Sequence, residues 1–323
     1  MRFLTEEDVG TLLPLERAID CVEHAFRDHA AGAAVDVPRV RTKTPMGTQH
    51  ILQAASTSLD VIGFKAYFPG AERRLFQAQL AQLSTGIPLA FVEADELGIR
   101  RTAAATAVAT RALSREDSAT VACFGTGRHG LMQLRAVCAV RAITAVRIHG
   151  RDAGRLERFA AQAGDELGLP VTIASSAEQA LAGADIVNIV TRADAPLFDG
   201  RLLSEGQHIN AVGSNALNRR EIDLQTIRRA DVLVVDAVEV ARNECGDLLP
   251  AVEAGLLQWH QVVELGQVLT GCRPGRSAPE QISLFESQGM GILDLYAAHH
   301  VYRAALELQA GALLPVRGHP ARG

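Results

Sequence analysis

The stretch CFGTGRHGLM, from Cys123 to Met132, contains the pattern G-x-G-x-x-G, with Gly125, Gly127 and Gly130 at the three glycine positions. Glycines at this spacing allow a tight turn from a strand into a helix. They also let a pyrophosphate approach backbone N–H groups at the positive end of that helix. The pattern alone is weak, so the surrounding sequence decides whether it predicts a dinucleotide site.

The residues after position 118 alternate between apolar strands and helical segments. The strand-like runs are ATVACF, AVRIHG, VTIAS, DIVNIV, HINAVG and DVLVVDA, and the first helix begins at Gly130. Such alternation predicts a parallel sheet covered on both faces, with the glycines where the first strand turns into the first helix. We therefore expect an α/β fold with a Rossmann doubly wound domain over residues 117–289. A glycine-rich turn without a ligand is the less favoured alternative.

The residues before position 117 predict a smaller α+β domain. Residues 13–32 carry apolar side chains at helical spacing, and RTAAATAVATRAL predicts a second helix capped by Thr102. Between them, HILQAAST, VIGFKAYF, LFQAQLAQL and IPLAFVEAD predict an antiparallel meander. A polar stretch over residues 114–118 marks the domain boundary. GMGILDLYAAHHVYRAALELQ predicts a late helix, and we expect residues 314–323 to form a flexible tail.

Composition excludes several classes of protein. The chain of 323 residues has a net charge of −5, which argues against a nucleic-acid partner. No apolar run reaches the length of a membrane span, and the N-terminus MRFLTEEDVG is acidic where a secretory signal would be basic. The five cysteines are scattered without a C-x-x-C pair, so we expect reduced thiols, no metal site and a cytoplasmic location.

The acidic residue that selects NAD is missing from its usual place. A Rossmann domain that prefers NAD carries Asp or Glu about twenty residues after the glycines. Here the sequence reads His149, Gly150, Arg151, Asp152. A guanidinium at this place favours a 2′-phosphate, so we expect NADP(H) to be mildly preferred over NAD(H). Alternatively, Arg151 is a solvated loop residue and Asp152 caps the next helix.

Cations gather in the N-terminal half of this acidic protein. Arg39, Arg41 and Lys43 alternate with uncharged residues, so in an extended strand they share one face and could bind an anion. A solvated edge strand is the favoured alternative for these three alone. Lys65 and Tyr67 occupy one face of their predicted strand and apolar residues the other, so Lys65 could simply face water.

Arg100 and Arg101 stand at the start of the predicted alanine-rich helix, where the helix dipole disfavours positive charge. A bound carboxylate would remove this conflict, since free N–H groups and a forked guanidinium together suit one. Two exposed arginines that point into solvent are an equally favoured alternative.

The sequence resembles the ornithine cyclodeaminase/mu-crystallin family along nearly its whole length. Apart from the glycine loop, the shared motifs are PR at Pro38-Arg39, GFK ending at Lys65, TGIPLA from Thr85, RTAA from Arg101, HINAVGSN from His208, REID from Arg220, ECGDL from Glu244 and LFESQGMGILDL from Leu284. The resemblance implies a homodimer of two-domain subunits. Residues 1–116, completed by a C-terminal helix over 290–313, would bind substrate and form the dimer, and residues 117–289 would hold the nicotinamide.

The resemblance also implies roles for particular residues. Arg39 and Arg101 look like a clamp for the substrate carboxylate, and Lys65 looks like the proton donor or acceptor. Residues that look like cofactor contacts are Gly125, Thr126, Gly127, Arg128, His129, Gly150, Arg151, Thr191, Ile209, Asn210, Ala211, Val212, Arg219 and Ser287.

The sequence departs from the family pattern at two places, and the second one separates the possible functions. His129-Gly130 stands where the family usually has Gln-Ala, and Asn215 stands where the cyclodeaminase has its essential aspartate. An amide has no basic site near neutral pH. We therefore expect an NAD(P)-dependent oxidoreductase that reduces a small 2-imino acid (ketimine) or reversibly oxidises an L-amino acid. The alternatives are a lyase of the ornithine cyclodeaminase type and a non-catalytic NADPH-dependent binding protein.

Overall fold

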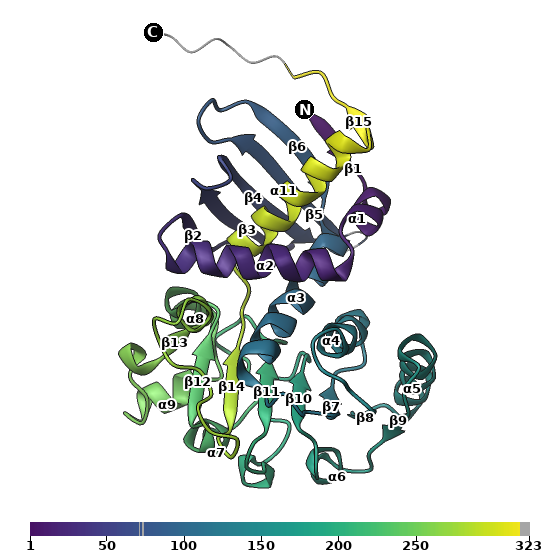
Figure 1. Ribbon diagram of the computed structural model, residues 1–323, viewed down its shortest axis with the longest axis vertical. Coiled ribbons are helices and arrows are strands. Elements are labelled where there is room, and N and C mark those ends of the chain that lie inside the picture. The colour runs from purple at the N-terminus through teal and green to yellow at the C-terminus, as the bar shows by residue number, and fades with distance from the viewer. Residues whose placement is uncertain (71, 73, 317–323) are drawn as a thin grey trace. The chain divides into compact units, whose positions relative to one another are not determined.

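The computed structural model describes residues 1–70, 72 and 74–316. It divides into two compact units, one of Met1–Arg101 with Met290–Gly323 and one of Thr102–Gly289 (Figure 1). The division falls inside helix α3 (Asp95–Leu113) rather than at the predicted boundary between 116 and 117. The polar stretch over residues 114–118 does not coincide with this division, because the chain passes from one unit into the other within a continuous helix.

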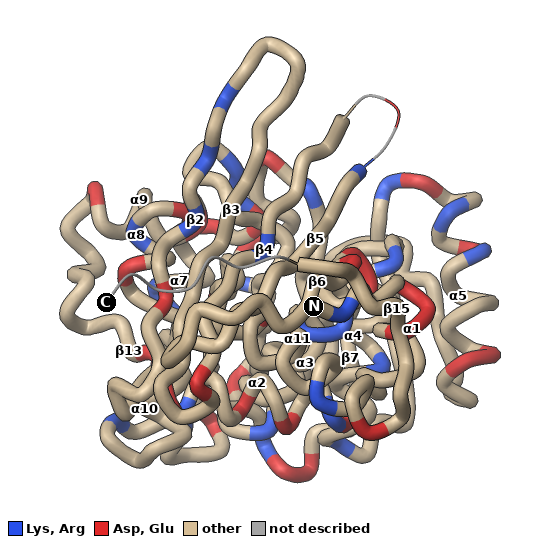
Figure 2. Tube along the Cα trace, turned by 90° about the horizontal axis from the view of Figure 1, so that it is seen from above, with Lys and Arg blue, Asp and Glu red and all other residues tan. Residues whose placement is uncertain are grey.

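The first unit contains a seven-stranded mixed sheet in the order β15-β1-β6-β5-β4-β3-β2. Five strands form an antiparallel meander, in which β2 precedes the four strands that the sequence predicts: β2 (Ala34–Thr44), β3 (Gly47–Ser56), β4 (Val61–Pro69), β5 (Arg74–Gln82) and β6 (Pro88–Glu93). The short strand β1 (Arg2–Leu4) pairs parallel to β6, and β15 (Ala312–Leu313) pairs antiparallel to β1. Figure 2 shows the cations of β2 as successive blue bands along that strand.

Helices cover one face of this sheet. They are α1 (Glu6–Leu12), α2 (Leu15–Ala30) and α11 (Gly291–Glu307), and Figure 1 shows α11 lying across the strands beside α2. α11 is buried almost all round, since residues from Gly291 to Ala298 are inaccessible to solvent on every side of the helix. The opposite face of the sheet exposes apolar side chains, among them Val35, Ile62 and Phe64.

The second unit contains an eight-stranded sheet in which every pair is parallel, in the order β13-β12-β14-β11-β10-β7-β8-β9. The strands are β7 (Thr120–Phe124), β8 (Ala145–His149), β9 (Val171–Ile173), β10 (Ile186–Ile189), β11 (His208–Ala211), β12 (Val232–Val235), β13 (Val263–Glu264) and β14 (Ser283–Glu286). The chain runs outward from β7 to β9 and returns to β10 on the other side of β7. This confirms the predicted doubly wound α/β fold, whose switch point lies between β7 and β10.

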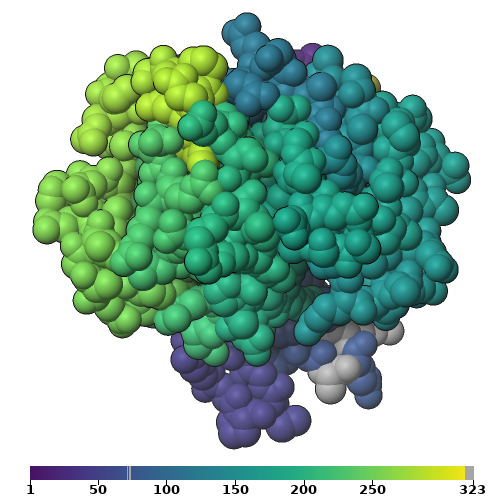
Figure 3. All heavy atoms as spheres, turned by 90° about the horizontal axis from the view of Figure 1, so that it is seen from below, coloured from purple at the N-terminus to yellow at the C-terminus, as the bar shows by residue number. Residues whose placement is uncertain are grey.

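Apolar layers bury both faces of the second sheet. Val121 and Cys123 of β7 belong to one cluster of buried side chains, whereas Ala122 and Phe124 belong to another. Alternate residues of one strand therefore lie in different cores, as a parallel sheet covered on both sides requires. Figure 3 shows the teal and green segments that form the lower face of this unit. The covering elements are α4 (Arg128–Cys138), α5 (Ala153–Leu167), α6 (Ala177–Leu181), α7 (Leu224–Arg229), α8 (Val238–Glu244), α9 (Leu249–Glu253), α10 (Leu265–Leu269) and the 3-10 turns η1 (Gly200–Leu202) and η2 (Trp259–Gln261).

The alanine-rich helix begins earlier than the sequence predicts. α3 starts at Asp95, so Thr102 lies inside it rather than at its cap. Its first turn carries Asp95 and Glu96, and their backbone N–H groups donate to the two carboxylate oxygens of Glu6 at 2.8 Å each. The anion at this helix start is therefore a side chain of the protein.

In the described part of the chain, no helix is long and apolar enough to cross a membrane.

Candidate active site

Lys65 lies in the middle of β4, on the face of the first sheet that α11 covers. Its side chain is only 4% exposed, although the sequence left open that it faces water. The alternation of β4 places Ile62 and Phe64 on the other, open face, where they are 42% and 37% exposed. The solvated interpretation of Lys65 is wrong, because a helix from the far end of the chain covers its face.

Asp294 of α11 joins Lys65 to Arg101 of α3. Lys65 Nζ donates to Asp294 Oδ1 at 2.7 Å, and Arg101 Nε donates to the same oxygen at 2.8 Å. Asp294 is 1% exposed and Arg101 is 6% exposed. Gly98 of α3 lies beside this arrangement, since a Cβ at that position would be in van der Waals contact with Lys65 Nζ at 3.5 Å. Three elements that are distant in sequence thus build one buried ionic cluster.

The surroundings of Lys65 lower its pKa into a range in which it can exchange a proton. Burial lowers the pKa of the ammonium, and the positive charges of Arg101 and Arg39 lower it further. The carboxylate of Asp294 acts in the opposite direction, and the balance lowers the pKa of Lys65 to about 8. A group with this pKa is mostly protonated at neutral pH and can still give up its proton.

Arg39 lies on the same face of the sheet as Lys65. Its guanidinium carbon is 6.0 Å from the ring centre of Tyr67, which is two residues from Lys65 along β4. Tyr67 stacks between His50 of β3 and Phe76 of β5, with ring centres 4.4 Å and 5.2 Å away. Burial and nearby arginines lower the pKa of His50 to about 4, so this histidine is neutral near pH 7. An aromatic surface therefore lies beside the arginine.

The other predicted cations have different surroundings. Arg41 is half-buried and Lys43 is exposed near the end of β2. Arg100 and Arg101 lie in the second turn of α3, not at its start. Arg100 donates to Glu96 at 2.7 Å and to the backbone oxygen of Leu13 at 2.6 Å, so it connects α3 to the N-terminal helices. Only Arg39 and Arg101 lie with Lys65.

The glycine loop of the second unit has the geometry that a pyrophosphate requires. Gly125 has a φ of +129°, and a Cβ there would lie 2.4 Å from the backbone oxygen of Val190. A Cβ at Gly130 would lie 2.1 Å from the oxygen of Gly125, so this glycine permits close packing of helix on strand. Gly127 caps α4 without a side-chain hydrogen bond and has open space beside it. These residues fit a dinucleotide, because the open position is the one that the phosphates approach.

The sheet order brings the other predicted cofactor residues to the same edge. Thr191, Val212 and Ser287 follow the ends of β10, β11 and β14, three adjacent parallel strands of which β10 pairs with β7. Gly150 and Arg151 follow β8 and are exposed, and Arg128 and His129 are exposed at the start of α4. Asp152 caps α5, accepting from Arg155 N at 2.9 Å.

The remaining predicted residues are buried or half-buried. Ile209, Asn210 and Ala211 are buried within β11, and the amide nitrogen of Asn210 donates to Thr110 and Asn188 at 3.0 Å. Arg219 and Asn215 are half-buried in the segment after β11. Thr126 is half-buried within the glycine loop.

Asp294 and Glu221 are among the buried acids that the sequence hypotheses did not single out. Glu221 accepts from Thr191 N at 2.7 Å and from Thr191 Oγ1 at 2.5 Å. Burial raises the pKa of Glu221 to about 7. Both residues lie in motifs that carry the family resemblance, REID and GILDL. The sequence does contain one indication that Asp294 is buried: apolar residues, Leu293 and Leu295, flank it on both sides.

The family model for the ornithine cyclodeaminase/mu-crystallin family matches residues 1–309. The chain belongs to this family. A Δ1-pyrroline-2-carboxylate reductase of Thermococcus litoralis, solved with NADH and L-proline, is 30% identical with a TM-score of 0.92 over 97% of this chain and 100% of that one. An archaeal alanine dehydrogenase dimer with bound NAD is 28% identical with a TM-score of 0.90, over 97% and 98%. A probable ornithine cyclodeaminase of Bordetella pertussis Tohama I is 32% identical with a TM-score of 0.88, over 98% and 100%.

Proposed function

We propose that the protein is an NAD(P)-dependent oxidoreductase that reduces a small 2-imino acid to an L-amino acid, or catalyses the reverse oxidation. The observation that carries this proposal is the buried cluster of Lys65, Asp294 and Arg101, with Arg39 on the same face of the sheet. Two cations beside a lysine that can exchange its proton suit a substrate with a carboxylate next to a C=N bond. The similarity to a reductase that binds NADH and L-proline supports the same chemistry.

In this mechanism Arg39 and Arg101 hold the substrate carboxylate and fix the orientation of the C=N bond. Arg101 donates its Nε–H to Asp294, and the substrate carboxylate would accept hydrogen bonds from the N–H groups at Nη1 and Nη2 of the same guanidinium. The hydride for the imine carbon would come from a bound nicotinamide. Lys65 donates a proton from Nζ to the imine nitrogen, which becomes an amine, and neutral Lys65 then takes a proton from water. In the oxidative direction neutral Lys65 accepts the proton from the amine.

The residues that would hold the cofactor are those at the carboxyl edge of the second sheet, from Gly125 to His129 with Thr191, Val212 and Ser287. We infer that NADP(H) is mildly preferred, because Arg151 is exposed beside Gly150 where an NAD-selecting acid would stand. The test compares the dissociation constants of NADPH and NADH for the wild type and Arg151→Ala. The variant should weaken NADPH about tenfold and leave NADH nearly unchanged; tighter NADH binding by the wild type would contradict the preference.

Asn215 separates reduction from cyclodeamination. A cyclodeaminase returns the same hydride and releases ammonia, and it needs a base for the second amine of its substrate, which the amide of Asn215 cannot be. The test offers the protein Δ1-pyrroline-2-carboxylate with NADPH or NADH, and separately ornithine with only a trace of cofactor. Stoichiometric oxidation of the reduced nucleotide supports the proposal. Proline and ammonia accumulating over many turnovers from ornithine would replace it with the cyclodeaminase alternative.

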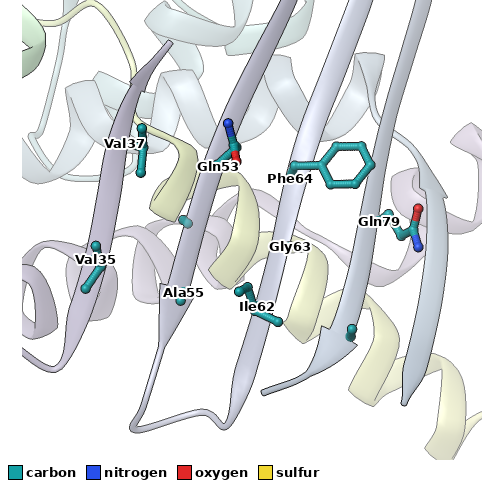
Figure 4. A pocket seen from close by; sticks show the side chains of 10 residues that line it. Val35, Val37, Gln53, Ala55, Ile62, Gly63, Phe64 and Gln79 are labelled. Carbon is teal, nitrogen blue, oxygen red and sulfur yellow. The ribbon is translucent and has the colours of Figure 1, made fainter. Parts of the chain in front are cut away.

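A homodimer is the assembly that we infer. The open face of the first sheet carries exposed apolar side chains beside small residues, and Figure 4 shows Val35, Val37, Ile62 and Phe64 along it with Gly63 between them. An apolar patch of this kind on a sheet is typical of a protein interface. The archaeal alanine dehydrogenase of the same family is a dimer.

We also place the protein in the cytoplasm. All five cysteines are free, and Cys123 and Cys245 are buried thiols. Unpaired cysteines of this kind suit a reducing compartment.

A further inference from the structure

Asp294 carries a charge that the proposed transfer of a hydride and a proton does not itself require. Its Oδ1 accepts from both Lys65 and Arg101. Its Oδ2 is buried and has no hydrogen-bond partner among the residues that the structure describes. Burying a carboxylate in this way costs free energy that an apolar side chain at this position would not cost. The position is therefore poorly explained by stability alone.

The geometry limits what Asp294 can do. A single oxygen receives Lys65 Nζ at 2.7 Å and Arg101 Nε at 2.8 Å, so it fixes the ammonium and the guanidinium relative to each other. The charged groups that act on Lys65 are Arg39 of β2, Arg101 of α3 and Asp294 of α11. The two arginines are positive and lower the pKa of Lys65. Asp294 is negative and raises it, so this carboxylate favours the protonated lysine.

We propose that Asp294 is a positioning residue, which orients Lys65 and Arg101 as one unit and keeps the proton on Lys65 until the nitrogen of the substrate takes it. The inference deepens the proposed function and rests on it, since it assigns Lys65 the role of proton donor. Asp294 does not touch the reacting atoms in this scheme. It acts through Lys65, and removing its charge should move the pH at which Lys65 loses its proton.

The sequence offers an unusually clean test, because the chain contains only two lysines, Lys43 and Lys65. Protein labelled with ¹³C at the ε-carbon of lysine therefore gives two signals, and Lys43→Arg assigns them. The exposed Lys43 serves as the reference within each sample. Titration of the protein without added nucleotide or substrate follows Lys65 directly and requires no turnover.

In the wild type the Lys65 signal should titrate with a midpoint near pH 8. Asp294→Asn removes the negative charge and leaves the desolvation and both arginines, so the midpoint should fall by about 1–3 pH units. The signal of Lys43 should titrate as before. An unchanged Lys65 midpoint in a folded Asp294→Asn protein would overturn the proposal.

Arg101→Met tests the same cluster from its other side and covers the case in which Asp294→Asn does not fold. Removing this cation should raise the Lys65 midpoint, because a positive neighbour is lost while Asp294 remains. If the midpoint does not rise, the three groups do not act as a unit and the proposal fails.

Kinetics separate this inference from the proposed function. If both hold, imine reduction by Asp294→Asn should lose at least about fivefold in kcat at pH 8 and much less at pH 6, where Lys65 regains its proton. Asp294→Glu, which keeps the charge, should restore most of the alkaline activity. An equal loss at both pH values would indicate a merely structural role and contradict the inference. The two proposals can also fail separately. If the wild type reduces no imino acid, the proposed function is refuted. If Asp294→Asn nevertheless shifts the Lys65 midpoint, the effect of Asp294 on Lys65 is still supported.

Discussion

The two sheets of this protein present functional groups in different ways. The sheet of the first unit is covered by helices on one face only, so a residue in the middle of a strand, Lys65, reaches a site beneath α11. The sheet of the second unit is covered on both faces, and its strands contribute buried apolar side chains to the layers on both sides. The loop at its carboxyl edge has open space beside Gly127. The comparison predicts that the proposed chemistry of the first unit and the proposed nucleotide binding of the second can be changed separately.

The largest expected effect tests this separation. Lys65→Met should lower turnover about 10³- to 10⁴-fold, because the group that exchanges the proton is lost. Nucleotide affinity, measured by fluorescence titration, should change less than about twofold. Lys43→Met is the matched control, since it removes the other lysine from an exposed position and should keep wild-type turnover. A Lys65→Met enzyme that retained most of its turnover would remove Lys65 from the mechanism.

The next largest effect contrasts two glycines of one loop. Gly130→Ala places a methyl group 2.1 Å from a backbone oxygen, so the second unit should lose about 2–4 kcal/mol of unfolding free energy. Gly127→Ala has open space and should unfold like the wild type while binding the nucleotide about tenfold more weakly. Urea unfolding followed by Trp259, the only tryptophan, reports on this unit. Equal stability of the two variants would contradict the packing role of Gly130.

A third change addresses the open face of the first sheet. Ile62→Glu places a charge on the exposed apolar surface and should weaken the proposed dimer at least about 100-fold, since a buried interface disfavours an unpaired charge. Light scattering over a range of protein concentrations measures the assembly. Val316→Glu, at another exposed apolar side chain, is the control. A wild type that is monomeric at all concentrations would refute the dimer, and an intact Ile62→Glu dimer would move it to another face.

The smallest expected effect concerns the buried acid beside Thr191. Burial raises the pKa of Glu221 from 4.5 to about 7, so the folded protein binds this proton where the unfolded chain has released it. Stability therefore falls as pH rises toward and through 7, and between pH 6 and pH 8 one such group accounts for about 1.4 kcal/mol. Glu221→Gln should reduce the loss of unfolding free energy over that interval by this amount. The same pH dependence in both proteins would show that Glu221 does not hold the proton.

Patterns within a few residues determined much of this protein from sequence alone. The glycine loop needs only the spacing of Gly125, Gly127 and Gly130 after an apolar run, because a turn and the helix that follows it are set by local backbone geometry. The meander of the first sheet follows from the period of two in its strands. The start of α3 was predicted at Thr102 rather than Asp95, because the acidic first turn is satisfied by Glu6, far away in sequence.

Only the tertiary structure decided which polar residues form the candidate site. Alternation in β4 places Lys65 opposite Phe64, but it does not say which face a helix will cover, and α11 comes 229 residues later at Asp294. Arg101 meets the same carboxylate across 193 residues. Burial, and with it the lowered pKa of Lys65, arises from the packing of distant elements, since desolvation depends on every atom that replaces water around a group. The sequence named Lys65, Arg39 and Arg101, and the fold added the carboxylate that holds two of them together.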